Sequence, residues 1–119
     1  INPIYFDLNK SNIRPDAAVE LDKIVEVMNE YVDMVVELGS HTDCRATVSY
    51  NRSLSDRRAK SSANYIRSRI SKPERIYGKG YGESKLKNRC ECEGRRAVPC
   101  SEEEHQENRR TEFVIITMD

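Results

Sequence analysis

Residues 32–43 read Val-Asp-Met-Val-Val-Glu-Leu-Gly-Ser-His-Thr-Asp, and this segment decides the fold. Met34, Val36 and Leu38 fall on one face of an extended chain, and acidic side chains fall on the other. This period of two predicts a half-buried strand that ends at Gly39. The polar residues Ser-His-Thr-Asp then follow as a loop at the carboxyl end of the strand.

Apolar residues on both sides of this segment recur at helical spacing. Before it, Pro15 suits a first helical turn because its φ angle is fixed. After it, a longer amphipathic stretch is stopped by Lys72-Pro73. The two predicted apolar stripes are Ala17, Leu21, Ile24 and Met28, and Leu54, Ala59, Ala63, Ile66 and Ile70. Such stripes are typical of helices that pack on a sheet through one face.

The rest of the chain supplies further strands and one short helix. Ser101 and Glu104 match a capping box, which predicts a helix start. Residues 113–116 are apolar on both faces, as expected for an interior strand. The predicted elements are strands over 1–6, 32–38, 75–81 and 110–118, and helices from 15, over 49–70 and over 101–108.

The element order β-α-β-α-β-(short α)-β predicts an α+β fold. We expect a two-layer sandwich with the helices packed on one face of a small mixed parallel and antiparallel sheet. The 119 residues suit a single domain over 1–119 with a modest core. Because the chain opens at Ile1 without a Met, we expect a domain excised from a longer protein, with any export signal or membrane anchor outside it.

Charge and hydropathy disfavour two classes of partner. The chain has 20 Lys and Arg against 20 Asp and Glu, so its net charge is zero, whereas nucleic-acid binders carry a positive excess. No apolar run approaches the roughly 20 residues of a transmembrane helix, so direct membrane insertion by this domain is not expected.

The four cysteines are Cys44, Cys90, Cys92 and Cys100. Their density favours an oxidising compartment and disulfide bonds, of which three pairings are open. A zinc site that includes His105 is the alternative, but zinc loops usually separate paired ligands by two to four residues. The spacing here therefore favours disulfides, and we expect neither a metal nor a cofactor.

Five phrases resemble the OmpA-like peptidoglycan-binding family, in family order and over nearly the whole chain. They are Phe6-Asp7-Leu8-Asn9-Lys10-Ser11, Gly39-Ser40-His41-Thr42-Asp43, Leu54-Ser55-Asp56-Arg57-Arg58-Ala59, Gly80-Tyr81-Gly82-Glu83-Ser84 and Asn108-Arg109-Arg110-Thr111-Glu112-Phe113. One departure is Ala46, where the family usually has Gly, which predicts a small change in loop path. The cysteine within the site loop also suggests that Cys44 pairs with Cys92, and Cys90 with Cys100.

The resemblance implies a site for the diaminopimelate residue of the peptidoglycan stem peptide. Asp43 would bind the side-chain ammonium of diaminopimelate, and Arg58 its carboxylate. The implied binding residues are Asp43, Arg58, Asn51, Arg109, Thr42, Phe6, Asp7 and Leu8. A guanidinium can hold a carboxylate through two parallel hydrogen bonds, and a requirement for both charges would reject a lysine stem residue.

The resemblance further implies a non-enzymatic anchor at the periplasmic face of the outer membrane of a Gram-negative bacterium. The parent chain would be an outer-membrane protein, a lipoprotein or a secretion-system component. Two alternatives stay open, a cell-wall hydrolase or amidase and a protein-interaction module of an envelope complex. His41 beside Asp43 invites a catalytic reading, but no activated nucleophile is evident in the sequence, and we interpret His41 as hydrogen-bonded within its loop.

Overall fold

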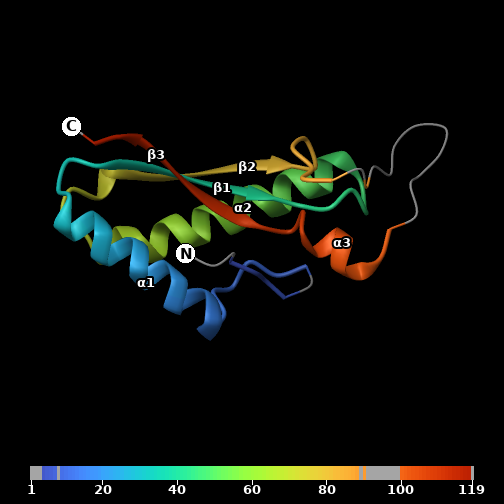
Figure 1. Ribbon diagram of the computed structural model, residues 1–119, viewed down its shortest axis with the longest axis horizontal. Helices are drawn as coiled ribbons and strands as arrows, with labels where there is room; N and C mark the ends of the chain where they lie inside the picture. The colour runs from blue at the N-terminus through green and yellow to red at the C-terminus, as the bar shows by residue number, and fades with distance from the viewer. Residues whose placement is uncertain (1–3, 8, 89, 91–99, 119) are drawn as a thin grey trace.

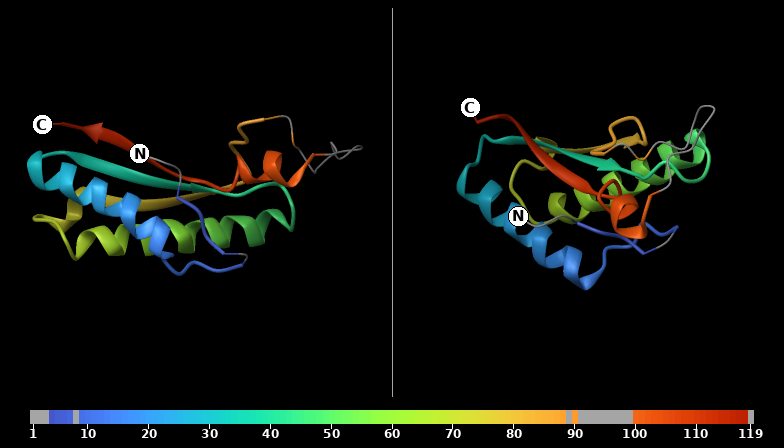
Figure 2. Two further views of the ribbon diagram at one scale, coloured as in Figure 1. Left: turned by 60° about the horizontal axis from the view of Figure 1, so that its bottom comes forward. Right: turned by 45° about the vertical axis from the view of Figure 1, so that its right-hand side comes forward.

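The computed structural model describes residues 4–7, 9–88, 90 and 100–118 as a two-layer α+β arrangement. Figure 2 shows the two long helices together on one face of the sheet. The elements are α1 (Pro15–Glu30), β1 (Val35–His41), α2 (Val48–Arg67), a 3-10 helix (Pro73–Arg75), β2 (Ile76–Gly82), α3 (Glu102–Gln106) and β3 (Thr111–Thr117). The predicted α+β sandwich is confirmed.

The sheet has the order β2-β1-β3, so β1 is its central strand. β1 runs parallel to β2 and antiparallel to β3, which makes the sheet mixed as predicted. A parallel pair needs a crossover connection, and α2 provides it between β1 and β2. The loop after β1 and the start of α2 therefore lie at the same end of the sheet.

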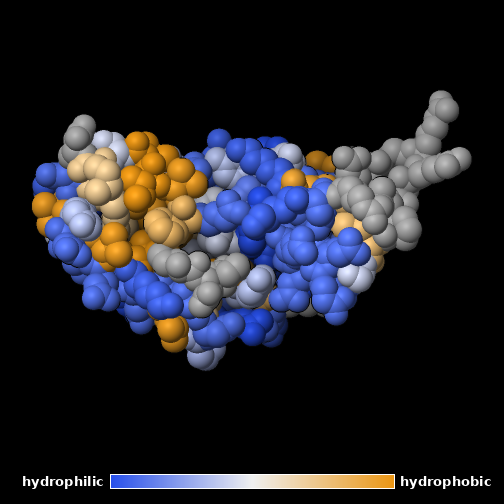
Figure 3. Space-filling view, in the orientation of Figure 1, coloured by the Kyte–Doolittle hydropathy of each residue, from blue (hydrophilic) through white to orange (hydrophobic). Residues whose placement is uncertain are grey.

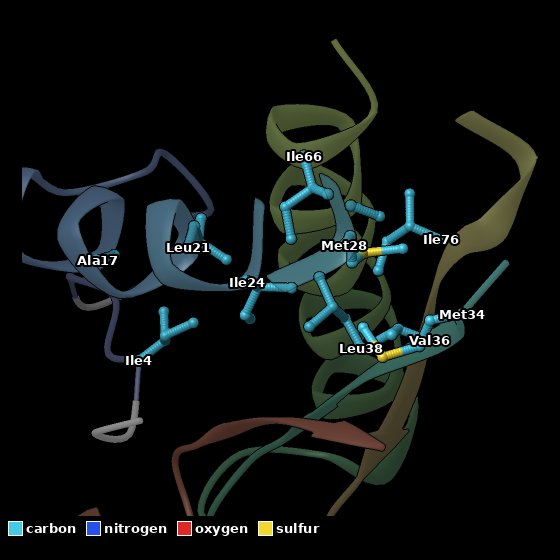
Figure 4. Packing of buried hydrophobic residues seen from close by; sticks show 11 residues of the cluster. Ile4, Ala17, Leu21, Ile24, Met28, Met34, Val36, Leu38, Ile66 and Ile76 are labelled. Atoms are coloured by element: carbon cyan, nitrogen blue, oxygen red, sulfur yellow. The ribbon is translucent and has the colours of Figure 1, made fainter. Parts of the chain in front are cut away.

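The core lies between the helices and this sheet (Figure 4). Leu21 and Met28 of α1 and Val36 and Leu38 of β1 are completely buried, and Ile66 of α2 joins them. The two apolar stripes predicted from the sequence contribute to this core. No helix within the described part of the chain is long and apolar enough to cross a membrane.

Two glycines of β2 bring α2 directly onto the sheet. A Cβ atom at Gly78 would lie 2.4 Å from the carbonyl of Ala59, and one at Gly80 would lie 2.3 Å from the backbone nitrogen of Asp56. Any side chain at these positions would push the helix away. This close approach fixes the first half of α2 beside the carboxyl ends of β1 and β2.

Two predicted strand boundaries at this end of the sheet are wrong. β1 does not end at Gly39 but continues to His41, because Ser40 still pairs with Gly80 on one side and Thr111 on the other. In the predicted first strand over 1–6, Ile4 forms an isolated bridge to Thr111, while residues 1–3 lie outside the described residues.

The prediction that residues 113–116 form an interior strand is also wrong. β3 is an edge of the described sheet, and Val114, Ile115 and Ile116 are 46%, 46% and 51% exposed. Phe113 packs against the core. Apolar residues gather at the end of the molecule where β3 finishes (Figure 3).

Candidate functional site

A pocket of about 400 Å³ opens where β1, α2 and α3 meet the N-terminal segment. It is lined by Phe6, Asn9, Thr42, Asp43, Arg45, Ala46, Tyr50, Asn51, Leu54, Arg58, Glu102 and Arg109. The fold thus brings together six of the residues that the sequence analysis selected, namely Phe6, Thr42, Asp43, Asn51, Arg58 and Arg109. Asp7 is not part of the lining, and Leu8 lies outside the described residues.

Asp43 is a buried carboxylate that is held by two arginines. Arg45 Nη2 donates to Asp43 Oδ2 at 2.9 Å, and Arg109 Nη1 donates to the same oxygen at 2.8 Å. The backbone N–H of Arg45 donates to Oδ1 at 2.9 Å. Burial alone would raise the pKa of Asp43, but the hydrogen bonds from Arg45 and Arg109 outweigh it and hold the pKa below its usual value. Asp43 is therefore an anion at neutral pH.

Arg58 is a buried cation whose hydrogen bonds go to backbone oxygens. Its Nε donates to the carbonyl of Lys10 at 2.8 Å, and its Nη2 to the carbonyl of Asp7 at 3.0 Å. The guanidinium carbon lies 5.1 Å from the centre of the Phe6 ring. Burial, followed by the charge of Arg109, lowers the pKa of Arg58, although a guanidinium stays protonated.

No carboxylate in the described part of the chain forms an ion pair with Arg58. The residue is only 4% exposed, so water compensates little for the missing counter-charge. A buried guanidinium that lines a pocket and has no carboxylate partner can bind an anionic group of a ligand through its remaining N–H donors.

Asn51 connects the site loop to the first turn of α2. Its Nδ2 donates to the carbonyl of Asp43 at 3.3 Å, the carbonyl of Arg45 at 2.9 Å and Glu83 Oε1 at 3.2 Å. The helix start is stabilised by Thr47, whose side chain accepts from the backbone N–H of Tyr50. Asn51 thus holds the backbone on both sides of Cys44 and sets the position of Asp43.

The loop also contains a strained residue. Ala46 has a φ of 73°, in the left-handed region that favours glycine. The small change in loop path relative to the family stays a prediction, since Ala46 adopts a φ that a glycine would adopt without strain. The strain lies three residues after Asp43 and two before α2 begins.

Arg45 and Glu102 are site residues that the sequence analysis did not select. Glu102 lies at the start of α3 and receives hydrogen bonds from both Arg45 and Arg109. The proximity of Arg45 to Asp43 in the sequence could have suggested its role. No sequence signal links Glu102 to a loop that lies 57 residues earlier in the chain.

His41 lies behind the pocket and does not make the loop hydrogen bond that the sequence suggested. Its ring stacks on Tyr81 at a centroid distance of 5.0 Å, and its Nδ1 is buried without a partner in the described structure. Burial, together with the nearby charge of Arg110, lowers the pKa of His41 to about 4. The imidazole is therefore neutral at physiological pH.

A disulfide between Cys90 and Cys100 confirms one predicted pairing. Cys44 is also disulfide-bonded, and its predicted partner, Cys92, lies outside the described residues. Glu104 approaches the Cys90–Cys100 pair, but the two sulfurs are bonded to each other and offer no thiolate. Ser101 follows this disulfide and forms the predicted capping box of α3 with Glu104.

Comparison with known proteins identifies sequence and fold relatives. Residues 5–98 match the sequence model of the OmpA family. A peptidoglycan-associated lipoprotein of Rhizobium meliloti is 32% identical over 100 residues, which cover 80% of this chain and 57% of that protein. The photosystem I P700 chlorophyll a apoprotein A2 of Gloeobacter violaceus is 33% identical over 115 residues, which cover 96% of this chain but 13% of that protein.

Solved structures share the fold. The cell wall anchor of the T6SS from Pseudomonas aeruginosa superposes with a TM-score of 0.71 and 24% identity, covering 92% of this chain and 72% of that one. The chain spans less than two thirds of the length of the two curated relatives described above. The likeness therefore concerns only part of those longer proteins.

Proposed function

Because the chain belongs to the OmpA family, we propose that it is a non-catalytic domain that binds bacterial peptidoglycan through the diaminopimelate of the stem peptide. It would anchor an outer-membrane protein, a lipoprotein or a secretion-system component to the cell wall at the periplasmic face of the outer membrane. The names of two similar proteins, a peptidoglycan-associated lipoprotein and a cell wall anchor, support this proposal.

The observation that carries the proposal is the pairing of charges in one pocket. Arg58 is buried there without a carboxylate partner among the described residues, and the anionic Asp43 lines the same space. The free end of diaminopimelate carries an ammonium and a carboxylate on one carbon. Its carboxylate would neutralise Arg58, and its ammonium would bind Asp43.

Other pocket residues support such a ligand. The hydroxyl of Thr42 is buried and has no hydrogen-bond partner among the described residues, so it is available to a polar ligand. Phe6 offers an aromatic wall beside the Arg58 guanidinium. Asp7 would act through its backbone oxygen, which orients Arg58. Asn51 would act by positioning Asp43 rather than by contacting the ligand through its amide nitrogen.

The proposed chemistry predicts selectivity without high affinity. A lysine stem residue has an ammonium but no second carboxylate, so it would leave Arg58 unpaired. Both charged groups of diaminopimelate are well solvated in water, which limits the gain on binding a single site. A polymeric wall presents many copies of the ligand, and retention would then depend on avidity.

Retention on insoluble sacculi tests the proposal. Purified domain is mixed with sacculi that contain diaminopimelate, and the Asp43→Asn and Arg58→Ala variants are compared with wild type. We expect each variant to lose retention by about tenfold or more, because each leaves one ligand charge unpaired. Arg57→Ala is the matched control, because Arg57 neighbours Arg58 in sequence but is exposed and donates a hydrogen bond to Ser53 Oγ on the same helix.

Thermal unfolding of each variant separates loss of binding from loss of fold. Sacculi with lysine at the third stem position should retain the wild type poorly. Equal retention of the wild type and both variants would overturn the pocket assignment. Release of dye from labelled sacculi by the purified domain would instead favour a hydrolase.

A further inference from the structure

Four charged side chains form a closed ring at the mouth of the pocket. Asp43 pairs with Arg45 and Arg109, and Glu102 pairs with the same two arginines. The four nearest nitrogen–oxygen distances are 2.9, 2.9, 2.8 and 2.7 Å. Each charge in the ring thus has two partners of opposite sign, and Arg58 remains outside it.

The ring places a guanidinium where a ligand ammonium would bind. Asp43 Oδ2 already accepts from Arg45 and Arg109, and Oδ1 accepts from the backbone N–H of Arg45. Because the Asp43 side chain is only 8% exposed, an incoming ammonium competes with a guanidinium for the carboxylate. The side chain of Arg45 is 47% exposed and that of Arg109 is 25% exposed, so Arg45 is the one that is freer to move.

Arg45 also has a second position available. Its Nη1 is bonded to Glu102 Oε2 at 2.9 Å, and this bond does not involve Asp43. When Arg45 leaves Asp43, it can keep Glu102 as its counter-charge. Glu102 is 59% exposed at the start of α3, which allows the pair to turn outward together.

On the premise that the pocket binds diaminopimelate, we propose that Arg45 competes with the ligand ammonium for Asp43 and so sets how tightly the site holds any ligand that carries an ammonium. In the empty site Arg45 occupies Asp43, and on binding it is transferred to Glu102. Arg45 thus competes with the ligand for Asp43, and Glu102 is the carboxylate that keeps Arg45 paired when the ligand is bound.

Because the ligand ammonium competes with Arg45 for Asp43, tight binding requires that the ligand also carries a carboxylate for Arg58. A ligand with an ammonium alone replaces one ion pair at Asp43 by another and gains little. A ligand that also carries a carboxylate gains the interaction with Arg58, which the protein does not satisfy by itself. Arg45 therefore weakens every ligand that places an ammonium on Asp43 by the same factor, and only a ligand whose carboxylate also gains the interaction with Arg58 binds well.

Three small probes measure this effect directly. All are acetylated at the α-amino group and amidated at the α-carboxyl, so that only the side-chain end is charged. Capped meso-diaminopimelate presents ammonium and carboxylate, capped lysine presents ammonium alone, and capped 2-aminopimelate presents carboxylate alone. Dissociation constants come from NMR titration of the wild type, Arg45→Ala, Glu102→Gln and the control Arg57→Ala.

For Arg45→Ala we expect capped lysine to bind up to roughly fivefold tighter, which corresponds to the loss of one competing, partly exposed ion pair. Capped diaminopimelate should tighten by a similar factor, because its ammonium meets the same competitor, whereas capped 2-aminopimelate should change little. For Glu102→Gln we expect weaker binding of capped diaminopimelate, because Arg45 loses its alternative partner and stays on Asp43. In the Arg45→Ala background, Glu102→Gln should have a much smaller effect.

The outcomes separate this inference from the proposed function. If the wild type binds capped diaminopimelate but Arg45→Ala binds the two ammonium probes no more tightly than the wild type does, the competition by Arg45 is refuted and the function stands. If Glu102→Gln binds capped diaminopimelate as the wild type does, the transfer to Glu102 is refuted. If the wild type does not bind capped diaminopimelate, both ideas fail. A merely structural role of Arg45 would weaken all three probes alike, whereas competition tightens the two ammonium probes and leaves capped 2-aminopimelate nearly unchanged.

Discussion

His41 makes the stability of the domain sensitive to mild acid. An unfolded chain protonates this histidine near its ordinary pKa of 6.5, whereas burial and the charge of Arg110 lower the pKa to about 4 in the folded protein. Between these pH values the unfolded state binds more protons, so the free energy of unfolding falls as the pH falls. The stabilisation is complete above about pH 6.5 and is lost as the pH approaches 4.

We therefore expect His41→Phe, which keeps an aromatic ring beside Tyr81, to flatten the pH dependence of stability between pH 4 and 6.5. As the pH falls from 6.5 to 4, the free energy of unfolding of the wild type should decrease by about 2 kcal/mol more than that of the variant. Urea denaturation at a series of pH values measures the difference. Parallel curves for the two proteins in this range would show that His41 titrates normally. Below pH 4 the protonation of Asp43 adds a separate loss, because its pKa is also lowered.

The connection between β1 and α2 combines a functional loop with an unfavourable backbone conformation. Ala46 has a φ of 73°, where a Cβ atom costs about 1–2 kcal/mol. Ala46→Gly removes this strain but adds freedom to the unfolded chain, so we expect a net gain of about 0.5–1 kcal/mol in unfolding free energy. Chemical denaturation of the wild type and the variant measures this change in unfolding free energy. The matched control is Ala18→Gly within α1, which should destabilise by about 1 kcal/mol, and the same sign for both variants would contradict the argument.

The apolar periodicity of the sequence predicted which segments form helices and strands better than it predicted where each strand lies in the sheet. The apolar alternation of Met34, Val36 and Leu38 located the buried face of the central strand, because burial on one face imposes a period of two. The apolar run over 113–116 carries no such information, since it fits an interior strand and an exposed edge equally well. Partners such as Arg45 and Glu102 come together only through the tertiary fold, so their ring could not be predicted.

The molecule separates a charged end from an apolar end. The ring and the pocket are built by the loop after β1, the start of α2 and the start of α3. β3 extends from this end of the molecule toward the opposite end (Figure 1), where apolar residues gather on the surface (Figure 3). The core between α1, α2 and the sheet supports both ends. α3 is different, because its helix is short and its position depends on local links. These include the disulfide at Cys100 and the bond from Asn88 to the carbonyl of Glu104.

The Cys90–Cys100 disulfide should therefore stabilise the whole domain and also serve the pocket. It closes a loop with a sequence separation of 10, for which the loss of unfolded-state entropy corresponds to about 2–3 kcal/mol. We expect the double variant Cys90→Ala/Cys100→Ala to lose about this much unfolding free energy in denaturant titrations. Because Glu102 begins the helix that follows Cys100, the variant should also bind capped diaminopimelate more weakly while still folded. Replacing the pair, rather than adding a reductant, leaves the disulfide of Cys44 intact. Unchanged binding in a destabilised variant would mean that the capping box of α3 holds Glu102 in place without the disulfide.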